Sequence, residues 1–445
     1  MTDTQNPGTA MKMDMPVEQS LSNVEIVSKS LPKRYAAETR FRWYGIVAIA
    51  LAVTFLGFLL LSIVTKGYSV IDQTKIRLTV DFTASEFVAN GNKTRQQLID
   101  GANYGAMAKS ALRDLFPEVK KRRDKRTLYK LISQGAVFEL RDVVQNDPTL
   151  IGQKADVWVT AGDDIDMLIK GYIDRNVAES DRKVSDKEIG FVDRLEQLDR
   201  IEKQFNANFF SAGDSREPEM AGIWGAVLGS FYTLMITLIL SLPLGVATAV
   251  YLEEFAPKNF WTNIIEVNIN NLAAVPSIIF GLLGLALLLN VFGLPRSAPL
   301  AGGVVLALMT LPTIIISTRA ALKAVPPSIR SAALGVGASR LQTVTHHVLP
   351  LATPGIMTGS IIGMAQALGE TAPLLMIGMV AFIVDLPTSP TDPSTVLPVQ
   401  IYIWADSPER AFVERTSAGI MVLLGFLITM NLTAVMIRKR LERQW

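Results

Sequence analysis

The sequence has 445 residues but no cysteine and only two histidines. Without cysteine, the chain can form neither a disulfide nor a thiolate metal site. His346 and His347 are neighbours, so on a helix they point in different directions and cannot both face one metal ion. We therefore expect no metal site and no histidine-based catalytic site.

Nucleotide-binding and charge signatures are missing as well. No G-x-x-x-x-G-K-[ST] loop is present, so the chain cannot hold ATP in the usual way, and no flavin or nicotinamide fingerprint occurs. The 43 basic and 41 acidic residues give a net charge of +2, which offers no argument for a nucleic-acid partner. We expect no cofactor and no enzymatic activity, and any energy that the chain uses must come from a partner or an ion gradient.

What the sequence does have is apolar length. Hydrophobic residues make up 49% of the chain and gather in long runs, which is typical of an integral membrane protein. The first run, Tyr44 to Val64, can cross a bilayer core of about 30 Å, and it is too long and too far from the N-terminus for a cleaved signal peptide. We predict a cytoplasmic tail at 1–43, disordered at its start, and a first transmembrane helix at 44–65.

Residues 66–218 are polar and contain no spanning run. The segments 76–82 and 155–160 alternate like strands, whereas 96–116 and 128–144 carry apolar residues at helical spacing. About 150 residues can bury a core of their own. We therefore predict a soluble α+β insertion domain after the first helix. Its basic run, 120–126, can guide an anion or bind lipid headgroups, but we favour a solvated helix face.

Five more apolar segments are long enough to span and would form a five-helix core within 219–445: 222–251, 272–292, 300–322, 352–384 and 415–437. Six spans put both termini on the same side. The acidic connection 385–414 then lies outside, and the basic loop 324–350 lies inside, as the positive-inside rule expects. We place both termini in the cytoplasm and the insertion in the periplasm.

The inner loop has an unusual composition. From Arg330 to Pro350 it is poor in apolar residues and rich in basic ones, with no acid. Gly335 and Gly337 are expected to break it into two short helical pieces, and Pro350 to close the second. A helical hairpin at the membrane surface suits the docking of a partner protein. On spacing alone, an ordinary cytoplasmic loop is the alternative.

The residues of this loop resemble the EAA loop of ABC-importer permeases. In that pattern Glu-Ala-Ala is followed after three residues by Gly, and after nine more by Ile-x-Leu-Pro. The same intervals are kept here by Ser331, Ala332, Ala333, Gly337, His347, Leu349 and Pro350. Ser331 stands in place of the Glu and His347 in place of the Ile. The resemblance implies that these residues, together with Arg330, dock an ATPase subunit.

The continuation Gly369-Glu-Thr-Ala-Pro-Leu-Leu375 is similar to the phosphate branch of these permeases, specifically to PstA-type subunits. The stretches Gly222 to Glu254 and Asn270 to Gly281 are similar to the first two helices of the permease core. The resemblance covers around half of the chain, from about residue 218 onward. It implies a mainly α, polytopic membrane protein with six transmembrane helices and the fold of a type I ABC-importer permease, without catalytic residues.

By the same resemblance, the chain would work in the bacterial inner membrane with a second homologous permease subunit, two ATPase subunits and a periplasmic phosphate-binding protein. It would form part of the translocation pathway for inorganic phosphate, while the ATPase subunits hydrolyse ATP. Two alternatives stay open. One is an ABC permease for another anion such as sulfate or molybdate, and the other is a membrane-anchored sensor with a periplasmic domain.

Polar residues inside the apolar runs are candidates for gating and translocation. A carboxylate near the bilayer centre costs about 2.5–3.5 kcal/mol, so Glu370 should face protein or water. It is a gating or coupling candidate together with Thr371, and a buried structural acid is the alternative. Gln366 lies one turn earlier on the same predicted helix face, at a position where the resemblance implies Arg in many relatives.

Two prolines suggest broken helices. Pro243 and Pro276 can free backbone amides that suit an oxyanion, with Ser230, Thr233 and Ser277 as neutral donors. Packing of helices through these hydroxyls is equally compatible with the sequence. Arg319, at the inner end of its span, is expected to snorkel to the membrane interface.

Overall fold

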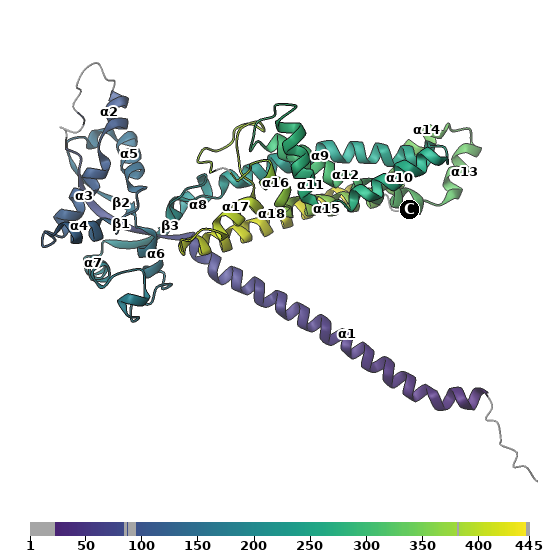
Figure 1. Ribbon diagram of the computed structural model, residues 1–445, viewed down its shortest axis with the longest axis horizontal. Helices are drawn as coiled ribbons and strands as arrows, with labels where there is room; N and C mark the ends of the chain where they lie inside the picture. Colours follow the sequence, from purple (N-terminus) through teal and green to yellow (C-terminus); the bar gives the residue numbers. More distant parts are fainter. Residues whose placement is uncertain (1–22, 84–86, 88–94, 381, 442–445) are drawn as a thin grey trace, which may run out of the picture. The chain divides into compact units, whose positions relative to one another are not determined.

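The computed structural model describes residues 23–83, 87, 95–380 and 382–441 (Figure 1). The chain divides after Ser62 into two units. The first consists of most of α1 (Asn23–Gly67), a 45-residue helix that contains the predicted first span. The predicted tail is therefore helical from Asn23 onward, and its first part, 1–22, lies outside the described residues.

The insertion is built on a three-stranded antiparallel sheet in the order β2–β1–β3. β1 (Asp72–Asp81) pairs with both β2 (Lys154–Thr160) and β3 (Ile201–Phe205). Ile76 and Leu78 of β1 are fully buried, because alternate side chains of a strand point to the same face. Both predicted strands are confirmed, and β3 is a third that the sequence pattern did not reveal.

The described helices around this sheet share one core with it: α2 (Arg95–Gly101), α3 (Tyr104–Leu115), α4 (Arg122–Tyr129), α5 (Ala136–Asn146), α6 (Asp163–Ile169) and α7 (Asp186–Gln197). The two predicted helices each divide in two. Asn103 begins α3, since its side chain accepts a hydrogen bond from the Ala106 amide at 3.0 Å. Between α4 and α5, the Ser133 amide bonds the Thr160 carbonyl at the sheet edge at 2.9 Å.

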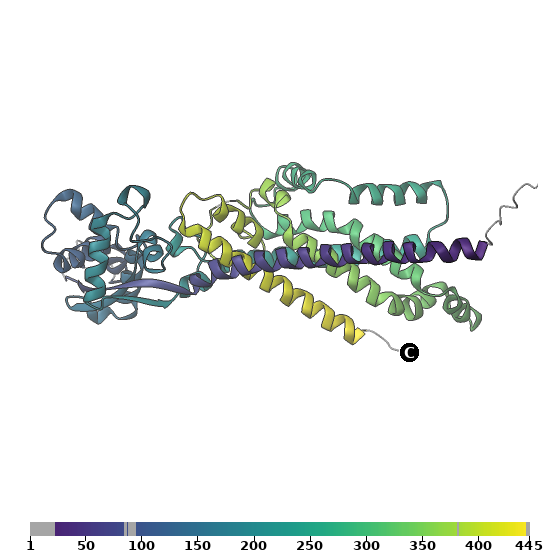
Figure 2. The same cartoon turned by 90° about the horizontal axis from the view of Figure 1, so that it is seen from below.

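The short α8 (Ala207–Ser211) leads into a helical core. Its helices are α9 (Trp224–Val250), α10 (Phe260–Ala273), α11 (Ser277–Leu283), α12 (Pro299–Ala324), α13 (Pro327–Gly335), α14 (Arg340–Thr343), α15 (Leu349–Gly369), α16 (Ala372–Met376), α17 (Leu397–Ala405) and α18 (Ala411–Leu441). α12 packs against α9 and α15, and α15 packs against α18 (Figures 1 and 2).

Within the described residues, five helical stretches are long and apolar enough to cross a membrane: 31–71, 224–255, 299–324, 340–369 and 411–440. A sixth crossing requires α10 together with the stretch Ser277–Leu289, and these are bent by 103°. The predicted span at 272–292 is therefore not one straight helix. Pro276 has no amide hydrogen, and its ψ of 135° is extended rather than helical, so α10 does not continue through it.

The predicted span at 352–384 is wrong at its end, because α15 stops at Gly369. Pro373 lies four residues further on. Its nitrogen cannot donate to the Gly369 carbonyl, and its ring would clash with that oxygen in a continuous helix. The chain therefore leaves the helix at Glu370 and begins the short α16 after Thr371.

Two other prolines do not interrupt their helices, contrary to prediction. The helical stretch from Arg340 to Gly369 continues through Pro350. A π-helical turn at Val344–Val348 already shifts the hydrogen-bond pattern where Pro350 lacks its amide hydrogen. Pro243 lies inside α9, where packing against α12 supports the helix despite one lost bond.

Small residues set how closely α9 and α12 approach. A Cβ atom on Gly303 would lie 2.6 Å from Cβ of Ile236 and 2.9 Å from the carbonyl oxygen of Thr233. The Thr237 hydroxyl contacts the carbonyl oxygens of Thr233 and Gly303 at 2.8 and 3.2 Å. Membrane helices commonly associate through such close contacts, because lipid offers no hydrophobic driving force.

We predict that Gly303→Ala destabilises the core by about 1–3 kcal/mol, because the added methyl group overpacks the α9–α12 contact. The measurement is the melting temperature of the purified protein in detergent. Gly425→Ala in α18 is the matched control, since a Cβ atom there meets nothing within 4 Å. Equal melting temperatures for wild type and both variants would contradict the close contact.

Candidate functional site

Between α12 and α15 the chain forms a helical hairpin at residues 327–348, hereafter the inner hairpin. It consists of α13, a turn, α14 and the π-helical turn, and Figure 1 shows α13 and α14 at one end of the core. Gly337 forms the turn with a φ of +91°, which an L side chain rarely adopts. Ser339 then caps α14 in a reciprocal capping box with Gln342.

Three large apolar side chains of the inner hairpin are exposed. Leu334 is 48% exposed, Val336 86% and Leu341 62%. They flank the turn at Gly337, on a loop whose other residues are mostly polar. An apolar group that is clustered at a turn and framed by polar residues is typical of a surface that contacts another protein.

Arg330 fastens the inner hairpin to the core. Its Nη2 donates to Oε1 of Glu254 at 2.6 Å, and its Nε donates to the same carboxylate at 3.2 Å. Its guanidinium also donates to the carbonyl oxygens of Val325 and Leu322 at 2.7 and 2.9 Å. Because Glu254 follows α9 in the π-helical turn Tyr251–Phe255, this forked ion pair ties α13 to the first helix of the core.

A second set of ion pairs joins three helices at the same end. Arg319 of α12 contacts Glu253 at 3.3 Å and Glu266 of α10 at 2.8 Å, and Lys323 lies 3.7 Å from Glu253. The Arg319 side chain is only 15% exposed. Two carboxylates from neighbouring helices thus hold Arg319 in place, while its snorkelling to the membrane interface stays a prediction.

Some of the predicted docking residues are exposed and others are buried or half-buried. Ser331 and Ala332 are exposed on the inner hairpin, and the exposed Gly337 forms its turn. Ala333 is buried at 5% exposure beneath them. Leu349 and Pro350 are half-buried at the start of α15, where Leu349 packs with Leu322 and Val348.

Sequence reasoning missed four residues of this region. The exposed Leu334, Val336 and Leu341 were detectable as apolar residues beside a glycine turn in a polar loop. Glu254 was not detectable as the partner of Arg330, because it lies 76 residues earlier in the chain and no local pattern connects the two.

Two predicted pathway hydroxyls are buried between helices. Ser230 is 2% exposed, and its Oγ accepts a hydrogen bond from the Leu397 amide at 2.8 Å. Thr233 is 1% exposed, and its Oγ1 has no hydrogen-bond partner among the described residues. Both line a cavity of about 10 Å³ beside Leu374, which is at the lower limit for one water molecule.

Glu370 lies where α15 ends, with extended backbone at φ −78° and ψ 122°. It is half-buried, and its carboxylate makes no hydrogen bond or ion pair with any residue that the structure describes. Thr371 precedes α16 and is also half-buried. Gln366 is exposed in the last turn of α15, so it no longer shares a continuous helix with Glu370.

Ser277 begins α11, directly after the bend at Pro276, and is half-buried. α11 packs against α16, so closely that a Cβ atom on Gly281 would lie 2.6 Å from Cα of Pro373. The structure thus brings the helix of Ser277 next to the helix break at Glu370. Thr233 reaches the same region from α9, since it shares its small cavity with Ala367 and Leu374.

Two family models match the chain. Residues 241–443 match the binding-protein-dependent transport system inner membrane component, and residues 28–179 match a domain of unknown function, DUF3333. The phosphate transport system permease protein PstA 1 of Mycobacterium tuberculosis is 31% identical over 217 residues, which cover 49% of this chain and 70% of that protein. The chain belongs to the family of PstA-type ABC permeases.

Other relatives match this permease over 39% and 48% of the chain. The probable ABC transporter permease protein YqgI of Bacillus subtilis is 34% identical over 172 residues, and the chain spans only 58% of its length. The PstA protein of Yersinia pestis is 29% identical over 213 residues, or 48% of this chain and 71% of that protein. The family and the apolar helices make this permease a multi-pass inner-membrane protein.

Solved structures of ABC transporters resemble this permease more distantly. The inward-facing MetNI methionine transporter covers 50% of this chain and 98% of its own, with 20% identity and a TM-score of 0.38. A bacterial transporter for the polysaccharide alginate covers 49% of this chain and 79% of its own, with 16% identity and the same TM-score.

We predict that Arg330→Gln destabilises this permease by about 1–3 kcal/mol, because Glu254 loses its forked, charge-assisted partner. Glu254→Gln should cost a similar amount, and the double variant less than the sum of both. The measurement is thermal unfolding in detergent. Arg340→Gln is the control, since Arg340 is exposed and pairs with no carboxylate among the described residues. Additive costs would show that the two side chains act independently.

Proposed function

We propose that this chain is the permease subunit of an ATP-driven importer of inorganic phosphate. The observation that carries the proposal is the inner hairpin, with an exposed apolar surface on one side and an ion pair to the core on the other. A loop with these two features can bind a partner protein through its apolar surface and transmit the partner's movement to the core through the ion pair. The names of the PstA relatives and the Gly369–Leu375 segment support phosphate as the substrate.

The partner at the inner hairpin is an ATPase subunit. Leu334, Val336 and Leu341 would enter a groove of that subunit, while Ser331 and Ala332 line the same face. Through Arg330 and Glu254, movement of α13 reaches the end of α9. Arg319 then links this end of α9 to α10 and α12. ATP-driven closure of two ATPase subunits would therefore move the helices of the core as a connected set.

The complete importer in this proposal contains a second homologous permease subunit, two ATPase subunits and a periplasmic phosphate-binding protein. Both termini and the inner hairpin face the cytoplasm, and the 66–218 domain faces the periplasm. This permease forms part of the translocation pathway and has no catalytic residue, since ATP hydrolysis takes place on the ATPase subunits.

The helix break at Glu370 is the proposed gate of the pathway. Two broken elements meet there: the bend at Pro276 before Ser277, and the interruption between α15 and α16. Broken membrane helices commonly mark substrate sites, because they present backbone groups and helix ends to the ligand. Glu370 has no ion-pair partner among the described residues, so its carboxylate is available to respond to substrate or to helix movement.

The proposal predicts ATP-dependent phosphate uptake into proteoliposomes that hold the assembled complex, with ATP inside and the binding protein outside. Val336→Asp should reduce ATPase co-purification and uptake by about tenfold or more, because a charge replaces a central apolar contact. Val413→Asp is the control, since Val413 is 55% exposed and lies in the 385–414 connection on the opposite predicted side.

Uptake and ATPase association that survive Val336→Asp would contradict docking through the inner hairpin. Excess sulfate or molybdate should leave phosphate uptake unchanged. Competition by either anion, together with their own ATP-dependent uptake, would reassign the substrate. An assembled complex that moves no anion under any energy source would favour the sensor alternative.

We predict that Glu370→Gln lowers ATP-dependent uptake by about tenfold while ATPase association is retained, because a neutral amide keeps the shape of the carboxylate but not its charge. Initial uptake rates at saturating ATP measure the effect. Asp385→Asn, in the exposed connection that follows, is the control. A wild-type rate in Glu370→Gln would leave Glu370 with a structural role only.

A further inference from the structure

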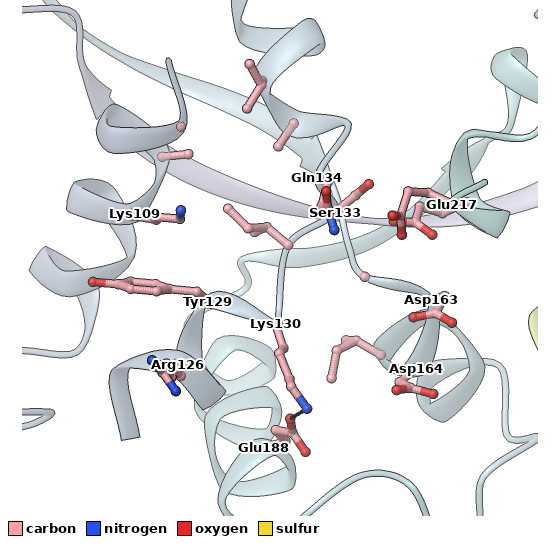
Figure 3. A pocket seen from close by; sticks show the side chains of 18 residues that line it. Lys109, Arg126, Tyr129, Lys130, Ser133, Gln134, Asp163, Asp164, Glu188 and Glu217 are labelled. Atoms are coloured by element: carbon pink, nitrogen blue, oxygen red, sulfur yellow. Dashed lines mark ion pairs between the residues drawn. The ribbon is translucent and has the colours of Figure 1, made fainter. Parts of the chain in front are cut away.

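The insertion contains a cleft of about 560 Å³, shown in Figure 3. Its walls come from α3, α4, the turn before α5, the start of α6 and the 217–219 segment that precedes α9. A cleft of this volume is in the usual range for small-molecule sites. It lies far along the chain from the inner hairpin and from Glu370, and the proposed transport mechanism makes no use of it.

The two walls of the cleft carry opposite charges. Lys109 and Arg126 lie on one side, and Asp163, Asp164 and Glu217 lie on the other (Figure 3). In the part of the chain that the structure describes, none of these five side chains forms an ion pair. Unlike charges that face a common cavity without reaching each other leave both sets available to a ligand.

Two further contacts lie in the cleft. The Lys109 ammonium lies over the ring of Tyr129, 5.7 Å from its centroid, and it has no carboxylate partner among the described residues. Lys130 and Glu188 lie between the walls and form an ion pair, with a separation of 4.0 Å (Figure 3).

Glu219 adds a buried carboxylate to the acidic wall. It is 4% exposed, and its Oε2 has no hydrogen-bond partner among the described residues. Its backbone is fixed, since the Glu219 carbonyl accepts a hydrogen bond from Nε2 of Gln73 at 2.6 Å. Burial raises the pKa of Glu219 to about 7, so the carboxylate is partly charged at neutral pH. A buried carboxylate oxygen without a donor is costly, and a ligand with N–H groups would satisfy it.

We propose that this cleft binds a small zwitterion, whose ammonium group contacts the acidic wall and whose phosphate or carboxylate group contacts Lys109 and Arg126. An anion alone would face the repulsion of Asp163, Asp164 and Glu217. A cation alone would leave Lys109 and Arg126 without a partner. Only a molecule with both charges complements both walls.

The ligand would also connect parts of the chain that lead to the core. The basic wall belongs to α3 and α4 within the insertion. On the acidic side, Asp166 of α6 pairs with Lys170 at 2.8 Å, and Lys170 pairs with Glu414 of α18 at 2.8 Å. The 217–219 segment leads directly into α9. A bound zwitterion would therefore connect the basic wall, on α3 and α4, to elements that continue into α9 and α18, the first and last helices of the core.

The test uses the full-length protein in detergent and isothermal titration calorimetry with phosphoethanolamine and 4-aminobutyrate. Ethanolamine and inorganic phosphate are the probes with one charged end. We expect at least one zwitterion to bind about tenfold more tightly than either single-charge probe. Phosphate binding as tight as that of phosphoethanolamine, or no binding by either zwitterion, would overturn the proposal.

Matched substitutions locate the site. Lys109→Gln and Asp164→Asn should each weaken zwitterion binding by about tenfold. Lys120→Gln and Asp114→Asn, at exposed positions outside the cleft, should bind as the wild type does. If Lys109→Gln or Asp164→Asn does not fold, Arg126→Gln, at an exposed position of the basic wall, takes its place. Unchanged affinity in all folded cleft variants would place the ligand elsewhere and overturn the assignment.

Hydrogen exchange tests the connection between the walls. A bound zwitterion should slow exchange both in α4 and in the 217–223 segment, because it contacts both walls at once. Slower exchange on one wall alone would overturn the bridging arrangement.

Discussion

The close contact of α12 with α9 and α15 is the constraint on which the core depends. In a membrane, helices gain little from hydrophobic burial against one another, so small residues that let backbones approach supply the contact. Gly303 does this towards α9. Towards α15, a Cβ atom on Gly359 would collide with the Ser317 side chain, which leaves no room for a larger residue. α12 is thereby packed against a helix on each of two sides. This packing holds Arg319 in position for its ion pairs with Glu253 and Glu266.

The insertion is joined to the core by a second, quite different interaction. The side chains of Lys170, Asp166 and Glu414 are each at most 4% exposed, and Lys170 pairs with both carboxylates. Asp166 also accepts a hydrogen bond from the Thr74 amide of β1 at 2.9 Å. Such a buried group is a weak source of stability, because desolvation offsets the attraction. However, its contacts can be made in only one geometry. The group therefore fixes the positions of β1, α6 and the start of α18 relative to one another.

The proline residues show how far sequence can predict this fold. Local patterns found two of the three strands and the break at Pro276, and they located most of the long apolar helices, although not the end of α15 at Gly369. Pro243 and Pro350 are the same residue in similar apolar surroundings, yet their helices continue. The difference lies in tertiary packing for Pro243 and in a neighbouring π-helical turn for Pro350. Neither cause is visible in a window of adjacent residues, whereas the effect of Pro373 on Gly369 follows from spacing alone.

The candidate site likewise combines features that local sequence predicts with features that depend on tertiary packing. Spacing predicted two short helical pieces in this loop, because Gly335 and Gly337 interrupt it, and Gly337 does form the turn. The attachment of Arg330 to Glu254 depends on α9 and α12 lying side by side, which only the folded chain establishes. A docking surface that moved independently of the core would transmit nothing. In the proposed mechanism, the long-range ion pair is the feature that would couple the inner hairpin to the core, and local sequence could not reveal it.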